Sequence, residues 1–140
     1  MKVREIMSKS VIYAKSNTSL ENIANMMKER NVGSIPICDE NQNIVGIVTD
    51  RDIVLRGVSN GNQNLTAKDV MTKDIVSVRP DMDTREAADL MAKNQIRRLP
   101  VVEGNKLEGM LAVGDIAVRS IYHDETADAM NAISKNNYFN

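Results

Sequence analysis

Two stretches of the chain carry apolar residues at a helical spacing. In the first stretch the stripe consists of Leu20, Ile23, Ala24 and Met27. In the second it consists of Thr84, Ala87, Ala88 and Met91. This i, i+3, i+4, i+7 spacing is typical of a half-buried helix. Ser19 and Asp83 precede the two stripes, and both residue types favour the N-cap position. We therefore expect a capped helix in each stretch.

Short apolar runs flank both predicted helices and indicate strands. The predicted strands lie at 11–14, 34–38 and 44–49 in one half, and at 75–78, 98–102 and 107–112 in the other. Polar turns at 39–43 and 103–105 join the last two strands of each half into a hairpin. A further helix is expected to start near Asp50 and near Gly114. Each half then reads as β-α-β-β-α, which predicts an α/β (α+β) fold.

The two halves are copies of one another. Val-Arg-Glu-Ile-Met-Ser-Lys at 3–9 returns as Ala-Lys-Asp-Val-Met-Thr-Lys at 67–73, and Ser-Ile-Pro-Ile at 34–37 returns as Arg-Leu-Pro-Val at 98–101. The identical pairs include Met7/Met71, Pro36/Pro100, Gly46/Gly109, Asp52/Asp115 and Arg56/Arg119. A duplicated unit of about 60 residues predicts two similar halves with apolar faces to bury against each other. A ligand site is then best sought where the halves meet.

The repeat also predicts the domain organisation. We expect a first repeat at 1–58, a linker at 59–66, a second repeat at 67–121 and a helical tail at 122–140. The linker contains the Gly and Asn residues typical of a connection. Ala127, Met130 and Ile133 form a stripe in the tail, which either pads the core or meets a partner.

Composition narrows the classes of function. A net charge of −1 offers no field for nucleic acid or membrane, and the absence of Trp and the 3% aromatic content offer few stacking platforms. The lone Cys38 excludes an internal disulfide framework and indicates a reducing compartment. No run resembles a signal peptide or a membrane span, so we expect a soluble, cytoplasmic protein.

The segment from Thr49 to Asp52 is the first candidate for chemistry. Thr49 ends a strand and can cap the helix that follows, so N–H groups there would point towards an anion. Asp52 could accept both hydroxyls of a ribose through its two oxygens. The alternative is an ordinary capping box. Asp115 keeps the acid although Ala112 has replaced the Thr, which favours a role for the acid beyond the cap.

Arg97 and Arg98 are the second candidate. They stand side by side at the start of a predicted strand, where two guanidinium groups could bind a phosphate in a forked geometry. The alternative is a pair of solvated charges at a strand edge. Gly33 and Ser34 occupy these positions in the first copy, so the fold of the repeat does not require the arginines.

The sequence contains little that indicates catalysis or a metal. His123 is the only histidine, and no Gly-rich phosphate loop is present. Asp39, Asn41 and Asn43 resemble the opening of a calcium loop, but Ile44 stands where such a loop needs Gly. We therefore expect a plain hairpin turn there, no metal site and no enzymatic activity.

Taken together, these motifs resemble a tandem pair of cystathionine beta-synthase (CBS) domains, a Bateman module of the stand-alone bacterial type. The resemblance covers about residues 1–121. It implies two repeats packed through their sheets about a pseudo-twofold axis, with two clefts that take AMP, ADP, ATP or other adenosine compounds. It also implies a homodimer.

The resemblance assigns roles to individual residues. Asp52 matches the ribose-binding acid and Thr49 a hydroxyl near ribose or phosphate. Asp115 matches the acid of the second cleft, where Ala112 departs from the usual Thr or Ser. Arg97 and Arg98 match a basic pair that reaches phosphates. Residues 8–12 and 72–76, with Ile12, Thr72 and Val76 among them, match positions that present backbone groups and apolar contacts to adenine.

These roles lead to a functional expectation. The ribose group belongs to the first copy and the phosphate group to the second, so we expect one competent nucleotide site and one weaker site. The chain would act as an adenine-nucleotide sensor that signals to an unknown regulated protein through ligand-dependent shape or assembly. The alternative is a ligand-free scaffold for interaction or dimerisation.

Overall fold

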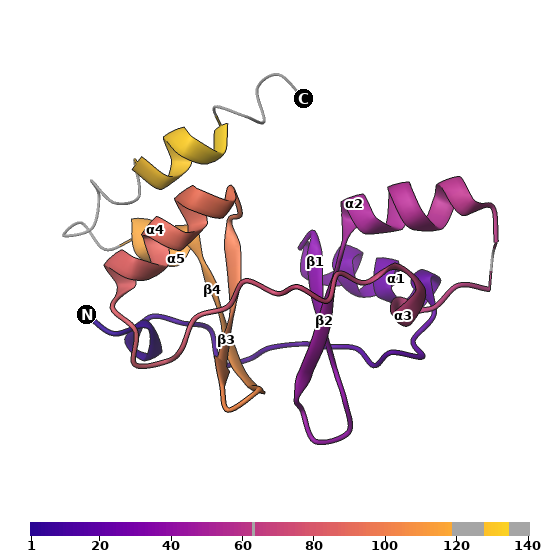
Figure 1. The fold of residues 1–140 in the computed structure, drawn as a ribbon, viewed down its shortest axis with the longest axis horizontal. Coiled ribbons are helices and arrows are strands. Elements are labelled where there is room, and N and C mark those ends of the chain that lie inside the picture. Colours follow the sequence, from indigo (N-terminus) through magenta and orange to yellow (C-terminus); the bar gives the residue numbers. More distant parts are fainter. Residues whose placement is uncertain (63, 119–127, 135–140) are drawn as a thin grey trace. The chain divides into compact units, whose positions relative to one another are not determined.

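The computed structural model describes residues 1–62, 64–118 and 128–134, and shows a mixed helix and strand fold with two small antiparallel sheets (Figure 1). The α-helices are α1 (Leu20–Arg30), α2 (Asp50–Asp52), α3 (Ala67–Val70), α4 (Thr84–Asn94) and α5 (Val113–Ala117). The strands are β1 (Ser34–Cys38), β2 (Ile44–Thr49), β3 (Arg98–Glu103) and β4 (Lys106–Ala112). Two 3-10 helices, η1 (Val3–Glu5) and η3 (Val58–Asn60), and one π-helix, η2 (Ile53–Gly57), complete the helical segments of the described residues 1–62 and 64–118. Residues 128–134 are also helical.

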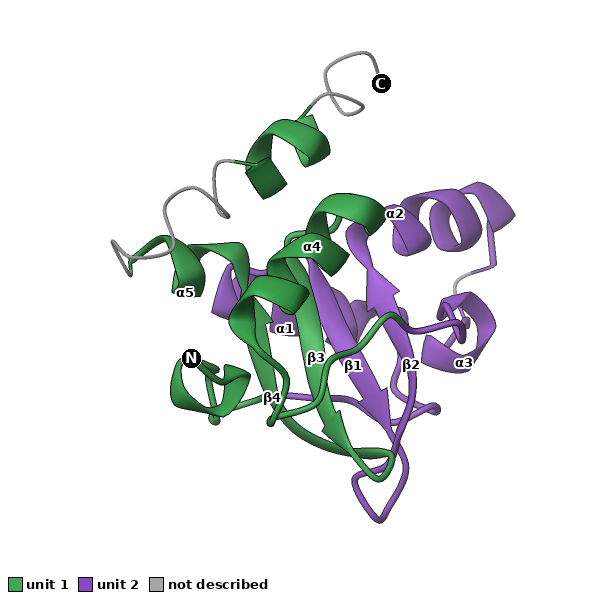
Figure 2. Cartoon of the chain, turned by 60° about the vertical axis from the view of Figure 1, so that its left-hand side comes forward, with its two compact units in different colours: residues 1–11, 76–140 green, residues 12–75 purple. Residues whose placement is uncertain are grey.

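The chain forms two compact units, which do not coincide with the sequence repeats (Figure 2). Unit 2 consists of residues 12–75, and unit 1 consists of residues 1–11 and 76–140. Each unit has one hairpin and one long helix from a single copy. The leading segments are exchanged: residues 3–9 of the first copy lie in unit 1, and residues 67–73 of the second copy lie in unit 2.

In unit 2 the β1–β2 hairpin is paired on both outer edges. The N–H of Ala14 donates to the carbonyl of Pro36 at 3.0 Å, and the N–H of Cys38 donates to the carbonyl of Ala14 at 2.9 Å. On the other edge Ile47 and Thr72 exchange two bonds of 2.9 and 2.8 Å. Unit 1 repeats both contacts. The N–H of Val78 donates to the carbonyl of Pro100 at 3.1 Å, and the N–H of Val102 donates to the carbonyl of Val78 at 2.8 Å. On the other edge Ser8 and Met110 exchange two bonds of 2.8 and 3.0 Å.

The strands predicted at 11–14 and 75–78 are therefore wrong in extent. Each is a single bridge residue, Ala14 opposite Ile37 and Val78 opposite Val101. The proline beside each bridge explains why. A parallel ladder continuing towards the N-terminus would next need the N–H of the proline, and proline has none. The duplicated prolines thus end the edge pairing at one residue.

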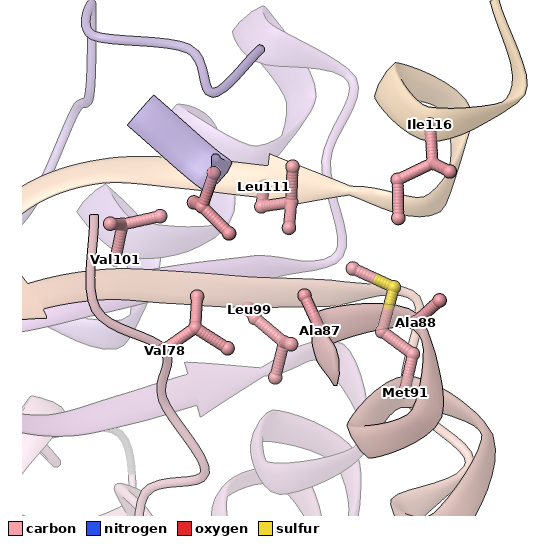
Figure 3. Packing of buried hydrophobic residues seen from close by; sticks show 9 residues of the cluster. Val78, Ala87, Ala88, Met91, Leu99, Val101, Leu111 and Ile116 are labelled. Atoms are coloured by element: carbon pink, nitrogen blue, oxygen red, sulfur yellow. The ribbon is translucent and has the colours of Figure 1, made fainter. Parts of the chain in front are cut away.

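Each unit has its own hydrophobic core. In unit 1 the helix α4 packs against the β3–β4 hairpin and α5 (Figure 3). The buried cluster of unit 1 is Val3, Val78, Ala87, Ala88, Met91, Leu99, Val101, Leu111 and Ile116. The buried cluster of unit 2 is Ala14, Ile23, Met27, Ile35, Ile37, Val48, Ala67 and Val70. The two sets occupy largely equivalent positions of the repeat.

The predicted helices and caps are largely confirmed. The Ser19 hydroxyl accepts from the N–H of Asn22 at 3.1 Å, and the Asp83 carboxylate accepts from the N–H of Arg85 at 2.8 Å. The bond from Arg85 also lowers the pKa of Asp83, and the nearby N-terminal ammonium lowers it further. One position of the α1 stripe is wrong. Ala24 is exposed, whereas Met26, on the opposite flank of the stripe, packs against the core.

Two glycines explain how the exchanged segments come so close to the hairpins. A Cβ on Gly46 would lie 2.6 Å from Sδ of Met71 and 3.1 Å from the carbonyl oxygen of Thr72. A Cβ on Gly109 would lie 2.6 Å from the carbonyl oxygen of Ser8 and 3.0 Å from Sδ of Met7. Each recurring Gly thus contacts the recurring Met of the other copy: Gly46 contacts Met71, and Gly109 contacts Met7.

The other sequence predictions have mixed outcomes. The buried Cys38 is a free thiol. Burial, and to a lesser extent the negative charge of Asp39, raises the pKa of this thiol to about 11. Cys38 is therefore a protonated core side chain at neutral pH. Ala129 and Ile133 of the tail helix are buried, whereas Ala127 and His123 lie outside the described residues. Among the described helices, none combines the length and the apolar character needed to cross a bilayer.

The close approach predicts a graded response to added methyl groups. We expect Gly109→Ala to lower the free energy of unfolding by about 1–3 kcal/mol, because the new Cβ meets a main-chain oxygen. Gly46→Ala should cost less, since the flexible Met71 side chain can move away. Gly114→Ala is the matched control, because no atom lies within 4 Å of its added Cβ. Urea unfolding of the three variants tests the order; equal losses for Gly109→Ala and Gly114→Ala would contradict it.

Candidate functional site

The junction of β2 and α2 is the first predicted site. We call it the unit 2 corner, residues 49–52. Thr49 is the N-cap of α2, and its Oγ1 accepts from the N–H of Asp52 at 3.1 Å. Asp52 Oδ2 accepts from the N–H of Thr49 at 3.0 Å. Asp52 is only 8% exposed. The capping box considered as the alternative is therefore present.

Two further groups face the carboxylate of Asp52. Oγ1 of Thr72 lies 3.4 Å from both carboxylate oxygens, and Nη1 of Arg56 lies 3.9 Å from Oδ1. One hydroxyl proton can serve one oxygen at a time, and 3.4 Å is long for such a bond. Asp52 thus has one short hydrogen bond, from the N–H of Thr49, and two weaker partners, Thr72 and Arg56.

Arg56 connects this acid to the exchanged segment. Its Nη1 also donates to the carbonyl of Val70 at 3.1 Å and lies 3.4 Å from the carbonyl of Met71. The sequence reasoning did not identify Arg56 as part of the site. Two signals were present: its identity with Arg119 in the repeat, and its spacing of four residues from Asp52, which places both on one face of a helix.

The junction of β4 and α5 is the equivalent place in unit 1. We call it the unit 1 corner, residues 112–115. Asp115 Oδ2 accepts from the N–H of Ala112 at 2.8 Å. The replacement of Thr by Ala112 therefore does not indicate a role for the acid beyond the cap. The acidic half of a capping box uses only the main chain of the N-cap residue, so the acid can cap when Ala replaces Thr.

Arg97 and Arg98 lie beside the unit 1 corner. The carbonyl of Arg97 accepts from the N–H of Val113 at 2.8 Å, and Arg98 pairs with Ala112 in the β3–β4 ladder. Both side chains are exposed, and neither guanidinium group has a hydrogen bond or ion pair among the described residues. This pair is therefore available to bind an anion.

The unit 2 corner has the opposite charge at the equivalent place. The carbonyl of Gly33 accepts from the N–H of Asp50 at 2.9 Å, and a Cβ on Gly33 would lie 3.2 Å from the Asp50 carboxylate. Asp50 stands where unit 1 has Val113. The unit 2 corner thus has two acids that can accept hydrogen bonds from hydroxyl groups, whereas the cations Arg97 and Arg98 lie beside the unit 1 corner.

The structure divides the predicted residues into two groups. Thr49, Asp52 and Thr72 lie together in unit 2, and Ile12 packs against the core of that unit. The predicted residues of unit 1 are Val76, Arg97, Arg98 and Asp115. Val76 packs against the core of unit 1 in the same way.

The calcium-like turn is a hairpin turn, as expected. Asp39 Oδ1 accepts from the N–H groups of Asn41 and Asn43, each at 2.9 Å. The N–H of Asn43 is the largest of the influences that lower the pKa of the Asp39 carboxyl. Within the described parts of the chain, no group of three or more His, Cys, Asp or Glu side chains is placed to hold a metal ion.

Comparison with known proteins agrees with this architecture. The family model for the CBS domain matches residues 3–58 and 67–121. The CBS domain-containing protein YhcV of Bacillus subtilis (strain 168) is 38% identical over 136 residues, which cover 96% of this chain and 96% of that protein. The chain belongs to the CBS domain family, and it is a pair of CBS domains.

Two solved structures of similar fold contain ligands. CBSX2, solved in complex with AMP, is 27% identical with a TM-score of 0.77, covering 88% of this chain and 98% of that chain. The CBS domain pair of protein MJ0100, solved with 5-methylthioadenosine and S-adenosyl-L-methionine, is 29% identical with a TM-score of 0.73. It covers 84% of this chain and 94% of that chain.

The capping geometry predicts a structural cost at the unit 1 corner without any ligand. We expect Asp115→Ala to lower the free energy of unfolding by about 1 kcal/mol, because the Ala112 N–H loses its acceptor. Asp115→Asn retains an acceptor oxygen and should lose less. The measurement is urea unfolding of nucleotide-free protein. Unchanged stability of the alanine variant would mean that the acid does not cap.

Proposed function

We propose that this CBS pair is a regulatory module that binds an adenosine nucleotide such as AMP and signals to a protein partner. The observation that carries the proposal is the likeness over most of the chain to CBS pairs solved with AMP and with S-adenosyl-L-methionine. The two corners supply suitable chemistry, since each has a carboxylate and two unpaired guanidinium groups lie beside the unit 1 corner.

Asp52 is proposed to receive the ribose. Its carboxylate has about four acceptor positions and one short bond, from the Thr49 N–H. The long contacts to the Thr72 hydroxyl are the ones that ribose hydroxyls can replace at the lowest cost. Thr49 contributes its hydroxyl at the same corner. In unit 1, Asp115 is the equivalent acceptor.

Arg97 and Arg98 are proposed to hold the phosphate. Two unpaired guanidinium groups can donate in a bidentate manner to one phosphate group. They are few for a triphosphate, which carries more negative charge, so the arrangement favours a monophosphate. Ile12, Thr72 and Val76 stand in the segments proposed to contact the adenine through backbone groups and apolar atoms.

Regulation requires that the nucleotide bind one arrangement of the protein more tightly than another. We propose that the responding state is a homodimer, whose shape or assembly the ligand changes. The alternative function is a ligand-free dimerisation scaffold. One observation favours that alternative: the carboxylate of Asp52 is nearly buried and already serves the cap, with Thr72 and Arg56 beside it.

Nucleotide binding distinguishes the two functions. We expect millimolar AMP to raise the melting temperature, because a ligand above its dissociation constant stabilises the native state. Calorimetric titration should show about 10–100-fold weaker AMP binding by Asp52→Asn, since a hydrogen bond to a charged group is lost. Asp69→Asn is the matched control, an exposed acid in the equivalent cap of α3. No effect of AMP, ADP, ATP or S-adenosylmethionine would favour the scaffold.

The hypothesis that Asp52 and the arginines hold one ligand has its own test. We expect the combined change of Asp52→Asn with Arg97→Gln and Arg98→Gln to weaken AMP binding by less than the product of the separate effects. The expected coupling is about 1 kcal/mol, as for groups that act on a shared partner. Two AMP sites per chain, one weakened only by Asp52→Asn and the other only by the arginine changes, would show that the acid and the arginines serve different ligands.

A further inference from the structure

We propose that Arg56 is a positioning residue that holds Asp52 and the segment before Thr72 in the arrangement that binds the ribose hydroxyls. This inference rests on the proposed function. Arg56 lies one helical turn after Asp52, and its Nη1 faces an acid and two main-chain carbonyls at once. No contact with the ligand is proposed for Arg56.

The carbonyls that Arg56 contacts need a partner. α3 ends at Val70, and the last carbonyls of a helix have no intrahelical donor. The guanidinium group satisfies the carbonyl of Val70 at 3.1 Å and approaches that of Met71 at 3.4 Å. A cation at this end also complements the helix dipole. The contact therefore fixes where the chain leaves α3.

Thr72 is the next residue, and its position follows from two anchors. Its main chain exchanges two bonds with Ile47 on β2, and Arg56 holds the carbonyls immediately before it. Between these anchors the Thr72 hydroxyl lies 3.4 Å from both oxygens of Asp52. Without Arg56 the segment would keep the β2 anchor and the bonds from the N–H groups of Ala67 and Lys68, but the Val70 carbonyl would lose its donor. Asp52 would also lose its nearby cation.

The orientation of Arg56 argues for positioning rather than for phosphate binding. Its Nη1 is directed at carbonyls of the same unit, in contrast to the unpaired guanidinium groups of Arg97 and Arg98. A lysine could keep the charge but could not reproduce the planar, multiply donating geometry. Arg56→Lys should therefore restore little of the lost function.

The test compares AMP with 2′-deoxy-AMP and 3′-deoxy-AMP by calorimetric titration of the full chain. We expect Arg56→Met to weaken AMP binding about 5–10-fold and the deoxy nucleotides much less, so that discrimination between them falls. Arg30→Met, on the exposed end of α1, removes the same charge and should change neither value. Equal weakening for all three nucleotides would reduce Arg56 to a general structural role and overturn the proposal.

A ligand-free measurement keeps this inference distinct from the proposed function. Hydrogen exchange should be about tenfold faster at the Thr72 amide in Arg56→Met, because the segment opens more readily, while amides of β3 and β4 stay unchanged. If the wild type binds none of the nucleotides, the proposed function fails, and faster exchange still supports positioning by Arg56. Unchanged exchange at Thr72 would overturn the positioning role in either case.

Discussion

The main-chain contact between each hairpin and the leading segment of the other copy is the constraint on which both units depend. Gly46 and Gly109 allow it, because a Cβ at either position would lie 2.6 Å from an atom of that segment. Each contact adds two hydrogen bonds to a sheet edge that would otherwise be open. Neither sequence repeat therefore contains a complete unit. The stability of unit 2 depends on residues 67–73, and that of unit 1 on residues 3–9.

The sequence predicted the elements better than it predicted their partners. The duplicated stripes, the hairpins and the caps at Ser19 and Asp83 follow local rules of period and capping, and these are confirmed. The exchange could not be predicted, because Met7 and Met71 are equivalent in the alignment and each would fit either glycine. The predicted strands at 11–14 and 75–78 failed for a local reason, since the neighbouring proline removes the next donor.

The site shows the same division. Residue type and spacing selected Thr49 and Asp52 as candidates, and the repeat added Asp115; the structure shows that all three take part in helix caps. The absence of Thr at position 112 suggested that Asp115 does more than cap a helix. The structure removes this reason, because Asp115 accepts its cap bond from the main-chain N–H of Ala112, which any residue except proline has. Arg56 was missed because its partners, Val70 and Met71, are carbonyls brought near by the exchange. Because every residue has a main-chain carbonyl, the residue types of a sequence do not show which carbonyls a side chain contacts.

The cap bond and the contacts that the proposed ligand would replace share one carboxylate, because Oγ1 of Thr72 lies 3.4 Å from the cap oxygen Oδ2 as well as from Oδ1. Oδ2 of Asp52 has a 3.0 Å bond from Thr49 that holds the start of α2, and this bond can persist when a ligand binds. The contacts at 3.4 Å involve Thr72, a residue of the second copy that lies within unit 2. Replacing them with ribose hydroxyls would leave the cap intact and release only the Thr72 side chain. A ligand can shift an equilibrium only through such differential contacts. We therefore place the first step of the proposed signal at Thr72, in the segment of the second copy that belongs to unit 2, rather than in the helix that Asp52 caps.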